Sequence, residues 1–343
     1  MTKQDKKQSE NSKVSLSDVA RAAGVSKMTA SRVLRDEGGF SEKTRAKVMT
    51  EVERLGYLPN RLATVFAGDR SSTFVGVAIP ELGNEIFTQV LEGIDRKLSS
   101  FGHQTVLGMT ENEPEQEEHW IETVLSWQPA GLIVTGRAHT KRATQLLTSA
   151  GIPVVEIWDF NSSPLDMCVG LNHFDSGYSM GRFLAGREYR KFGYVGTHHD
   201  TANAAGARMA GFTTAVEDAG GRLSKQLLLK DVPGFYTGFY GTEQLLAANR
   251  DIEVIYFQND NMAIGGLNYC KRIGLDMPQD IGIAGWGDLP ITAIQPFRLT
   301  STAVSHLKIG QLASEMVLRR ISGQSVEATK DVGFSLIQGN TTR

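Results

Sequence analysis

From residue 14 onward, apolar residues recur at the spacing of short helices. Residues 15–18, SLSD, have the form of a capping box and begin a first helix. Gly24 then permits a tight turn, and Ser26 can cap a second helix. A third apolar stripe follows over residues 41–56. The pattern predicts two helices joined by a turn of roughly three residues, followed by a third helix.

Beyond residue 73 the pattern changes to short apolar runs that alternate with amphipathic stretches. Runs typical of buried strands lie at 74–79, 105–107, 131–134 and 152–157, and after Pro164 at 169–171, 192–195, 227–229, 252–257 and 281–284. Helical spacing occurs at 86–98, 176–189, 206–219, 237–248 and 261–273. Such alternation predicts an α/β fold of parallel sheets, and the two successive runs predict two lobes. A ligand would then bind between the lobes, at the carboxyl ends of the strands.

These patterns divide the chain into four segments. Residues 1–13 are polar and charged without an apolar period, so we expect a mobile arm. A small all-α domain is predicted over residues 14–60, a connecting segment over 61–72 and the two-lobed body over 73–343.

Length and composition agree with several soluble domains. A chain of 343 residues is too long for one hydrophobic core, and its 41% hydrophobic and 22% charged residues exclude a wholly disordered chain. No run approaches the ~20 apolar residues of a membrane helix, and the start, MTKQDKKQSENSK, lacks the apolar core of a signal peptide. We therefore expect a cytoplasmic protein with no membrane partner. Cys168 and Cys270 match neither a disulfide framework nor a zinc spacing, so both are expected to be buried.

The charge is distributed unevenly along the chain. Residues 1–70 hold 14 Lys and Arg against 9 Asp and Glu, whereas the remainder holds 22 against 29. A basic front on an acidic body indicates that the front meets a polyanion, because attraction to phosphates scales with local positive charge. A solvated lysine-rich tail is the alternative.

Several motifs for catalysis and cofactors are missing from the sequence. It contains no GxGxxG, GxxxxGK[ST], HExxH or EF-hand pattern, so neither an enzyme nor a cofactor is expected. Residues 198–200, HHD, could ligate a metal, but no third ligand has helical spacing, and a polar loop is the favoured interpretation.

Residues 16–33, LSDVARAAGVSKMTASRV, strongly resemble the DNA-binding head of the LacI/GalR repressor family, and residues 56–63, GYLPNRLA, resemble its junction between head and hinge. A second helix in the major groove presents its early side chains to base edges. Lys27 can donate to guanine, and Met28 can pack on a thymine methyl group. The candidate DNA contacts are Ser17, Lys27, Met28, Thr29, Ser31, Arg32, Asn60, Arg61 and Phe66. A three-helix protein-binding module is the alternative.

The connecting segment corresponds to the hinge helix of that family. Residues 61–67 are too short for a stable isolated helix, so they should become ordered only on docking. The resemblance implies that two hinge helices of a homodimer pair in the minor groove, where a leucine forces a base step apart. This chain has Phe66 at that place, and an aromatic wedge is chemically reasonable. Alternatively, Phe66 only seats the hinge on the body.

The body resembles the effector domain of the same family, which is of periplasmic-binding-protein type. Within the family the chain is most similar to gluconate operon repressors. The phrases that carry this resemblance are SKMT at 26–29, LSW at 125–127, GLI at 131–133, Arg137 with HT at 139–140, and GIPVVE at 151–156.

The resemblance also implies ligand contacts. Arg208, in RMAGF, matches the arginine that binds ligand oxygens, and Asn259, in NDNMA, matches a polar cleft residue. Family members often carry an aspartate after the following aromatic residue, whereas Trp286 is followed by Gly287 and Asp288 here. This departure disfavours a cyclic sugar and agrees with an anionic ligand, which an extra carboxylate would repel.

Other candidates follow strands of the first lobe. Arg137 and His139 could meet a ligand carboxylate, although Arg137 could equally form a surface ion pair. The remaining candidates of the first lobe, each of which could face either the cleft or the core, are Asn84, Phe87, Glu156 and Trp158. Trp286, from the second run of strands, is also a candidate. For Asn259 and its neighbour Asp260 the alternative is a helix cap and its turn.

Together these features predict a homodimeric, ligand-responsive repressor that binds double-stranded operator DNA and senses a sugar acid such as gluconate. A ligand that prefers one arrangement of the lobes would change operator affinity by linkage. The alternative is a binding protein or enzyme for sugars or sugar acids with an appended head.

Overall fold

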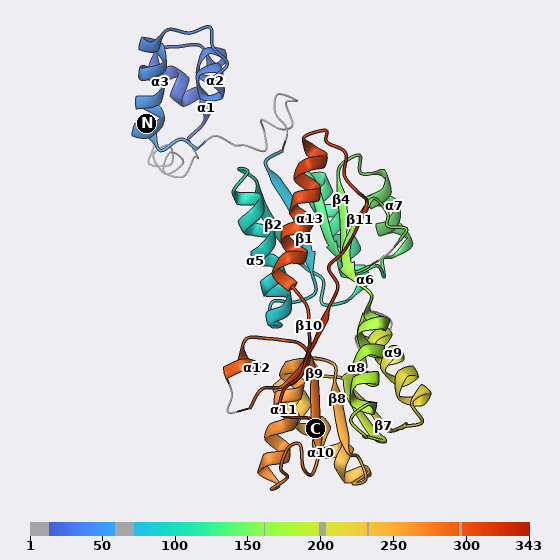
Figure 1. The fold of residues 1–343 in the computed structure, drawn as a ribbon. Coiled ribbons are helices and arrows are strands. Elements are labelled where there is room, and N and C mark those ends of the chain that lie inside the picture. The colour runs from blue at the N-terminus through green and yellow to red at the C-terminus, as the bar shows by residue number, and fades with distance from the viewer. Residues whose placement is uncertain (1–13, 59–71, 161, 199–203, 232, 295–296) are drawn as a thin grey trace. The chain divides into compact units, whose positions relative to one another are not determined.

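The computed structural model describes residues 14–58, 72–160, 162–198, 204–231, 233–294 and 297–343. The chain divides into two compact units, Met1–Ser71 and Ser72–Arg343 (Figure 1). The arm expected over residues 1–13 lies outside the described residues, as does the hinge expected over 61–72 apart from its last residue. We call the described part of the first unit the head and the second unit the body.

The head is a small bundle of α1 (Leu16–Ala23), α2 (Lys27–Arg35) and α3 (Glu42–Leu55). Ser15 and Asp18 cap α1 reciprocally, and Gly24 ends it in the left-handed conformation at φ 65°. Ser26 caps α2 by accepting a hydrogen bond of 3.0 Å from the backbone nitrogen of Thr29. The predicted helices and their caps are thus confirmed. The buried core consists of Val19, Ala20, Ala23, Ala30, Val33 and Val48.

The first lobe of the body, residues 72–171 and 306–331, contains a six-stranded sheet in the order β11-β5-β4-β3-β1-β2. Every neighbouring pair in it is parallel. Its strands are β1 (Phe74–Ile79), β2 (Gln104–Met109), β3 (Gly131–Thr135), β4 (Val154–Asp159), β5 (Met167–Leu171) and β11 (Thr329–Asp331). Its helices are α5 (Glu85–Ser99), α6 (Pro114–Ser126), α7 (Lys141–Ser149) and α13 (His306–Ile321).

The second lobe, residues 173–303 and 335–343, contains a six-stranded sheet in the order β12-β10-β9-β8-β6-β7. It is parallel except where β12 pairs with β10. Its strands are β6 (Lys191–Thr197), β7 (Arg222–Leu229), β8 (Val254–Phe257), β9 (Gly282–Gly287), β10 (Thr300–Ala303) and β12 (Ser335–Ile337). Its helices are α8 (His173–Ala185), α9 (Ala204–Asp218), α10 (Phe235–Ala248), α11 (Asp260–Arg272) and α12 (Ile291–Ile294).

The α/β fold class is confirmed, but the two lobes are not two successive halves of the chain. In the described part of the chain the backbone passes between the lobes at residues 171–173, 303–306 and 331–335 (Figure 1). Helix α13 and strand β11 therefore return to the first lobe after residues 173–303 of the second lobe, and β12 then ends in the second lobe. The sequence pattern missed β10, the strand before this return, because β10 is polar, TSTA, although Ser301 and its two threonine neighbours are buried. Hydrogen bonds satisfy two of these hydroxyl groups, because Ser301 Oγ donates to Asp260 Oδ1 at 2.6 Å and Thr300 Oγ1 lies 2.7 Å from Thr342 Oγ1. The hydroxyl of Thr302 has no hydrogen-bond partner among the described residues.

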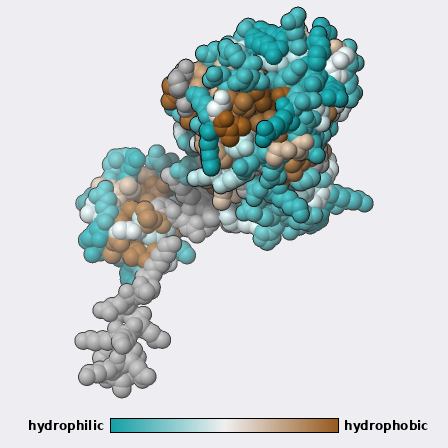
Figure 2. Space-filling view, turned by 90° about the horizontal axis from the view of Figure 1, so that it is seen from below, coloured by the Kyte–Doolittle hydropathy of each residue, from teal (hydrophilic) through white to brown (hydrophobic). Residues whose placement is uncertain are grey.

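The visible surface of the body in Figure 2 is mainly hydrophilic, with hydrophobic residues gathered in limited areas. Among the large apolar and aromatic side chains that are exposed, Phe235, Tyr236 and Tyr240 all belong to α10. Both cysteines are free and buried, as expected. No helix in the described part of the chain is long and apolar enough to cross a bilayer.

Three helix pairs of the body approach so closely that their backbones touch. A Cβ atom at Gly177 of α8 would overlap the carbonyl oxygen of Arg208 on α9, and one at Gly211 of α9 would overlap that of Phe174 on α8. The same reciprocal contact joins α5 to α13 and α10 to α11, through Gly93 with Gly310 and Gly238 with Gly265. These glycines are required by close packing.

We expect Gly177→Ala to destabilise the body by about 1–3 kcal/mol, the usual cost of overpacking a tight contact. Gly83→Ala is the control, because Gly83 has open space around its Cβ position and no positive φ. Urea unfolding followed by tryptophan fluorescence measures the body alone, since all 4 tryptophans lie in it. Equal midpoints for the two variants would contradict the close contact.

Candidate functional site

A cavity of about 230 Å³ lies between the two lobes of the body. Its walls come from the carboxyl ends of β1, β3 and β4 in the first lobe and of β8 and β9 in the second, together with α9. This is the position that parallel strand order predicts for a ligand site. Six of the ligand-contact candidates line it: Asn84, Phe87, Trp158, Arg208, Asn259 and Trp286.

Three other candidates are placed elsewhere. Arg137 lines a neighbouring cavity of about 390 Å³, which shares Ala138 and Asp159 with the first. His139 and Glu156 lie behind the wall, on neither cavity surface.

Arg208 is a buried cation with neutral partners. Its side chain projects from α9, and the residue is 5% exposed. Nη2 donates to the carbonyl oxygen of Gln258 at 3.2 Å, Nη1 lies 3.0 Å from His173 Nδ1, and the guanidinium lies 4.0 Å from the ring centre of Trp286. Within the described residues no carboxylate lies at ion-pair distance from it. A buried charge without a counter-charge is costly, so the site favours an anionic ligand.

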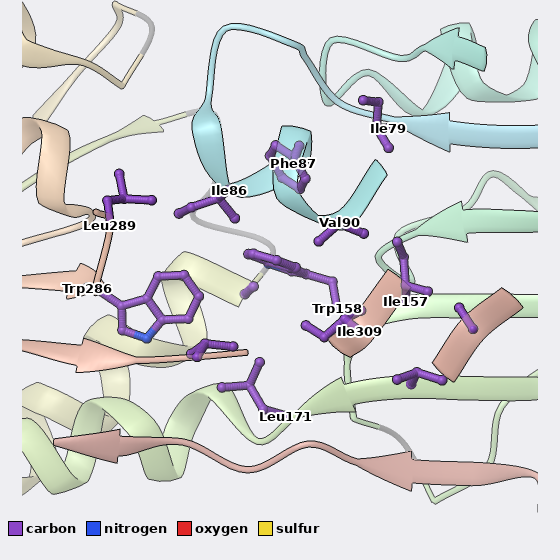
Figure 3. Close-up of a cluster of buried hydrophobic side chains, with 14 of the residues drawn as sticks. Ile79, Ile86, Phe87, Val90, Ile157, Trp158, Leu171, Trp286, Leu289 and Ile309 are labelled. Carbon is purple, nitrogen blue, oxygen red and sulfur yellow. The ribbon is translucent and has the colours of Figure 1, made fainter. Parts of the chain in front are cut away.

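Trp158 supplies an aromatic wall of the cavity. Figure 3 shows it within a cluster of buried hydrophobic side chains that includes Phe87 and Trp286. Its ring lies 5.1 Å from that of Phe87, 5.7 Å from Trp286 and, stacked, 5.8 Å from His306. Its backbone has φ 93°, outside the region that a large side chain prefers. Strain of this kind persists only where the surroundings impose it and is frequent at ligand sites.

Two buried histidines begin the helices that follow connections between the lobes, His173 on α8 and His306 on α13. Burial lowers the pKa of His306 to about 4, and the charge of Arg208 adds to this effect. Burial and the same charge also hold the pKa of His173 well below its usual value. Both rings are therefore neutral at physiological pH. Neither histidine was among the residues predicted from the sequence, although each directly follows a segment that connects the lobes.

Asp159 was also missed, although it directly follows Trp158 at the end of β4. It lines both cavities. Burial raises the pKa of Asp159 to about 6, even though the charges of Arg208 and Arg137 act in the opposite direction.

His139 binds the protein's own carboxylates. Its Nδ1 lies 2.6 Å from Glu117 Oε2, and its Nε2 lies 3.6 Å from Glu156 Oε1. Burial by itself would lower the pKa of His139, but the hydrogen bonds and charges of Glu117 and Glu156 outweigh burial and raise it to about 9. Glu117 lines the ligand cavity, so His139 influences the cavity through that residue.

Asn84 and Asn259 have two roles in the structure. Each caps a helix, because Asn84 Oδ1 accepts from the nitrogen of Ile86 at 3.2 Å and Asn259 Oδ1 accepts from that of Met262 at 2.9 Å. Each also lines the cavity, where the amide nitrogen can donate to a ligand. The cap and the ligand-contact interpretations are therefore compatible.

The start of α2 carries the exposed side chains expected of a recognition helix. Lys27 and Arg32 are exposed, and Met28 is 68% exposed although it is apolar. Ser17, Thr29 and Ser31 are partly exposed, and the hydroxyl of Thr29 lies 2.8 Å from that of Ser26. Asn60, Arg61 and Phe66 lie outside the described residues.

Two family models match the chain. Residues 15–60 match bacterial regulatory proteins of the lacI family. Residues 72–337 match periplasmic binding proteins and the sugar binding domain of the LacI family.

Relatives match over nearly the whole length. The chain is 33% identical to the HTH-type transcriptional regulator GntR of Escherichia coli, with 95% of this chain and 98% of that protein covered. It is 32% identical to the regulator of the same name in Pseudomonas aeruginosa, with 100% and 99% covered. A crystal structure of a LacI-family transcriptional regulator from Silicibacter pomeroyi superposes with a TM-score of 0.90 at 35% identity, covering 96% of this chain and 100% of that one.

We expect the His139 contacts to make stability depend on pH. Because folding raises the pKa of His139 from 6.5 to about 9, its contribution is complete below pH 6.5 and disappears as the pH rises to about 9. The loss should amount to about 3 kcal/mol at most. Urea unfolding at pH 6, 7.5 and 9 measures it, with His139→Gln as the comparison. A difference between wild type and variant that stays constant over this range would contradict the interpretation.

Proposed function

This chain belongs to the LacI family of bacterial regulatory proteins, and on that premise we propose that its effector is a sugar acid such as gluconate. It is a DNA-binding transcriptional repressor with a helix-turn-helix head and a two-lobed body of the sugar-binding type. The alternative interpretation as an enzyme with an appended head is wrong, because the family and the relatives are transcription regulators.

The observation that carries the proposal is the buried guanidinium of Arg208. It is fixed by stacking and by neutral hydrogen-bond partners, and it lines the cavity. A ligand carboxylate would supply the missing counter-charge through charge-assisted hydrogen bonds, which are about twice as strong as neutral ones.

The rest of the cavity suits a polyhydroxylated chain. The amides of Asn84 and Asn259 can donate to hydroxyl groups, and the carboxylates of Glu113 and Glu117 can accept from them. Phe87 and Trp158 offer apolar faces to carbon-bound hydrogens. A volume of about 230 Å³ suits one small ligand. The similarity to regulators named GntR and the resemblance to gluconate operon repressors support the same ligand class.

We assign operator recognition to the head. We also propose that the protein binds DNA as a homodimer. Lys27 and Met28 stand at the exposed start of α2, where a recognition helix meets base edges. Two heads related by a twofold axis would read the two halves of a palindromic operator. On the body, the exposed aromatic residues of α10, among them Tyr236 at 81% exposure, supply an apolar surface that a second copy could cover.

The mechanism follows from the cavity walls. Because both lobes contribute to the site, a ligand binds with different affinity when the lobes move relative to each other. Ligand binding and operator binding are then linked through one conformational equilibrium, without covalent chemistry. Phe66, as the hinge wedge, remains a prediction.

We expect Arg208→Ala to weaken gluconate binding roughly 10-fold to 150-fold, which corresponds to one lost charge-assisted interaction. Binding of glucose should change less, because glucose carries no carboxylate. Calorimetry with gluconate, its lactone and glucose measures both, and Arg222→Ala, an exposed arginine outside the cavity, is the control. Tighter binding of glucose than gluconate by the wild-type protein would refute the sugar-acid assignment.

We expect Lys27→Ala and Met28→Ala to relax or redirect operator preference while gluconate binding stays unchanged. One good base contact is worth ~1–3 kcal/mol of discrimination. Selection from a random DNA library reports the preferred sequence, and Lys47→Ala on α3 is the matched control for loss of an exposed lysine. If all four proteins selected the same sequence, α2 would not be the recognition helix.

A further inference from the structure

Asp159 is a second charged group that the ligand must meet. It stands at the carboxyl end of β4, its side chain is 21% exposed, and it lines both cavities. Its nearest polar contact is His173 Nε2, 3.5 Å from Oδ1, and among the described residues its carboxylate accepts no hydrogen bond.

A neutral imidazole separates this carboxylate from Arg208. A guanidinium can only donate, so His173 Nδ1 accepts from Arg208 Nη1 at 3.0 Å, and this assigns the ring hydrogen to Nε2. That Nε2 lies 3.1 Å from the carbonyl oxygen of Trp158 and faces Asp159. Arg208 and Asp159 therefore lie near opposite nitrogens of the His173 ring and line the same cavity, but they do not form an ion pair.

We propose that Asp159 takes up a proton when a sugar acid binds and then donates a hydrogen bond to the ligand carboxylate, which makes it a specificity residue for acids. The proposal rests on the proposed function of the cavity. One O–H bond forms on Asp159, and the bond that held this proton in hydronium or in the acid form of the buffer breaks. The ligand carboxylate and Asp159 would otherwise be two like charges in one cavity, which cannot both remain ionised without cost.

The charged and titratable groups around Asp159 come from several elements of both lobes. These groups are Glu156 on β4, Glu81 after β1, Glu113 and Glu117 at α6, Arg137 and His139 after β3, His173 on α8, Arg208 on α9 and His306 on α13. Glu117 is bound to His139, and Glu113 is exposed at the rim.

Protonation of Asp159 would make the affinity for a sugar acid depend on pH. Burial already raises the pKa of Asp159 to about 6, and a second carboxylate raises the pKa further in the complex. A sugar acid, with a carboxyl pKa of about 4, stays ionised over this range. Affinity for the acid should therefore increase as the pH falls from 8 towards 6, by at most about tenfold per pH unit.

The test is calorimetry of the full chain with gluconate at pH 7.5 in phosphate and in Tris, two buffers whose ionisation heats differ. The heat difference gives the number of protons taken up, and we expect a value approaching one for wild type. Asp159→Asn should bind gluconate without proton uptake, and at pH 8 about tenfold more tightly than wild type. Asp159→Ala should also lose the uptake, but without the gain in affinity, because alanine cannot donate. Glu122→Gln, which removes a carboxylate that lines neither cavity, should keep both the uptake and the affinity.

The outcomes separate this inference from the function on which it rests. Gluconate binding without proton uptake by wild type, or equal uptake by Asp159→Asn, overturns the role of Asp159 and leaves the sugar-acid assignment standing. Absence of gluconate binding to wild type and to Asp159→Asn at both pH 6 and pH 8 overturns both.

Discussion

The body is organised around one buried positive charge. Arg208 can stay charged inside the protein only because Trp286, His173 and the carbonyl oxygen of Gln258 hold it. These partners come from α8, from β9 and from the end of β8, so several elements must meet at one point. The glycine contact between α8 and α9 allows this meeting, since a side chain at Gly177 would overlap the backbone of Arg208 itself. The site and the helix packing are therefore parts of one arrangement.

The two lobes also contact each other close to Arg208. Trp158 belongs to the first lobe and Trp286 to the second, and their rings lie 5.7 Å apart beside two buried neutral histidines. His173 and His306 each begin a helix directly after the backbone has passed between the lobes. Any rotation of one lobe against the other must change the contacts among these four rings, and both tryptophans line the cavity. Under the proposed function, these ring contacts would link ligand binding to the relative position of the lobes.

Patterns within a few neighbouring residues predicted most of the helices and strands. The predictions failed where contacts between residues far apart in the sequence determine the structure. Helix caps such as Ser15 and Gly24 act within a few residues, so the head could be predicted closely. Arg208 and Asn259 were found because each lies in a recognisable phrase beside a strand or helix end. His139 was expected to meet a ligand, but its partner Glu117 is 22 residues away on another helix, and spacing does not reveal that contact. Strand β10 was missed because it is polar, and the partner that allows the Thr300 hydroxyl to be buried, Thr342, lies 42 residues further along the chain.

The return of α13 and β11 to the first lobe constrains how the protein can be made. As the chain leaves the ribosome, residues 72–171 emerge first, yet the helix that packs on α5 and the edge strand beside β5 are among the last to appear. The first lobe must wait, with an apolar face of α5 uncovered, until residues 173–303 of the second lobe have been synthesised. The second lobe can pack most of its core during translation, because residues 173–303 follow one another in the chain. The final segment, residues 306–343, then completes both lobes almost simultaneously. A premature stop before residue 306 would therefore remove more than a tail, because it would leave the first lobe without one of its layers.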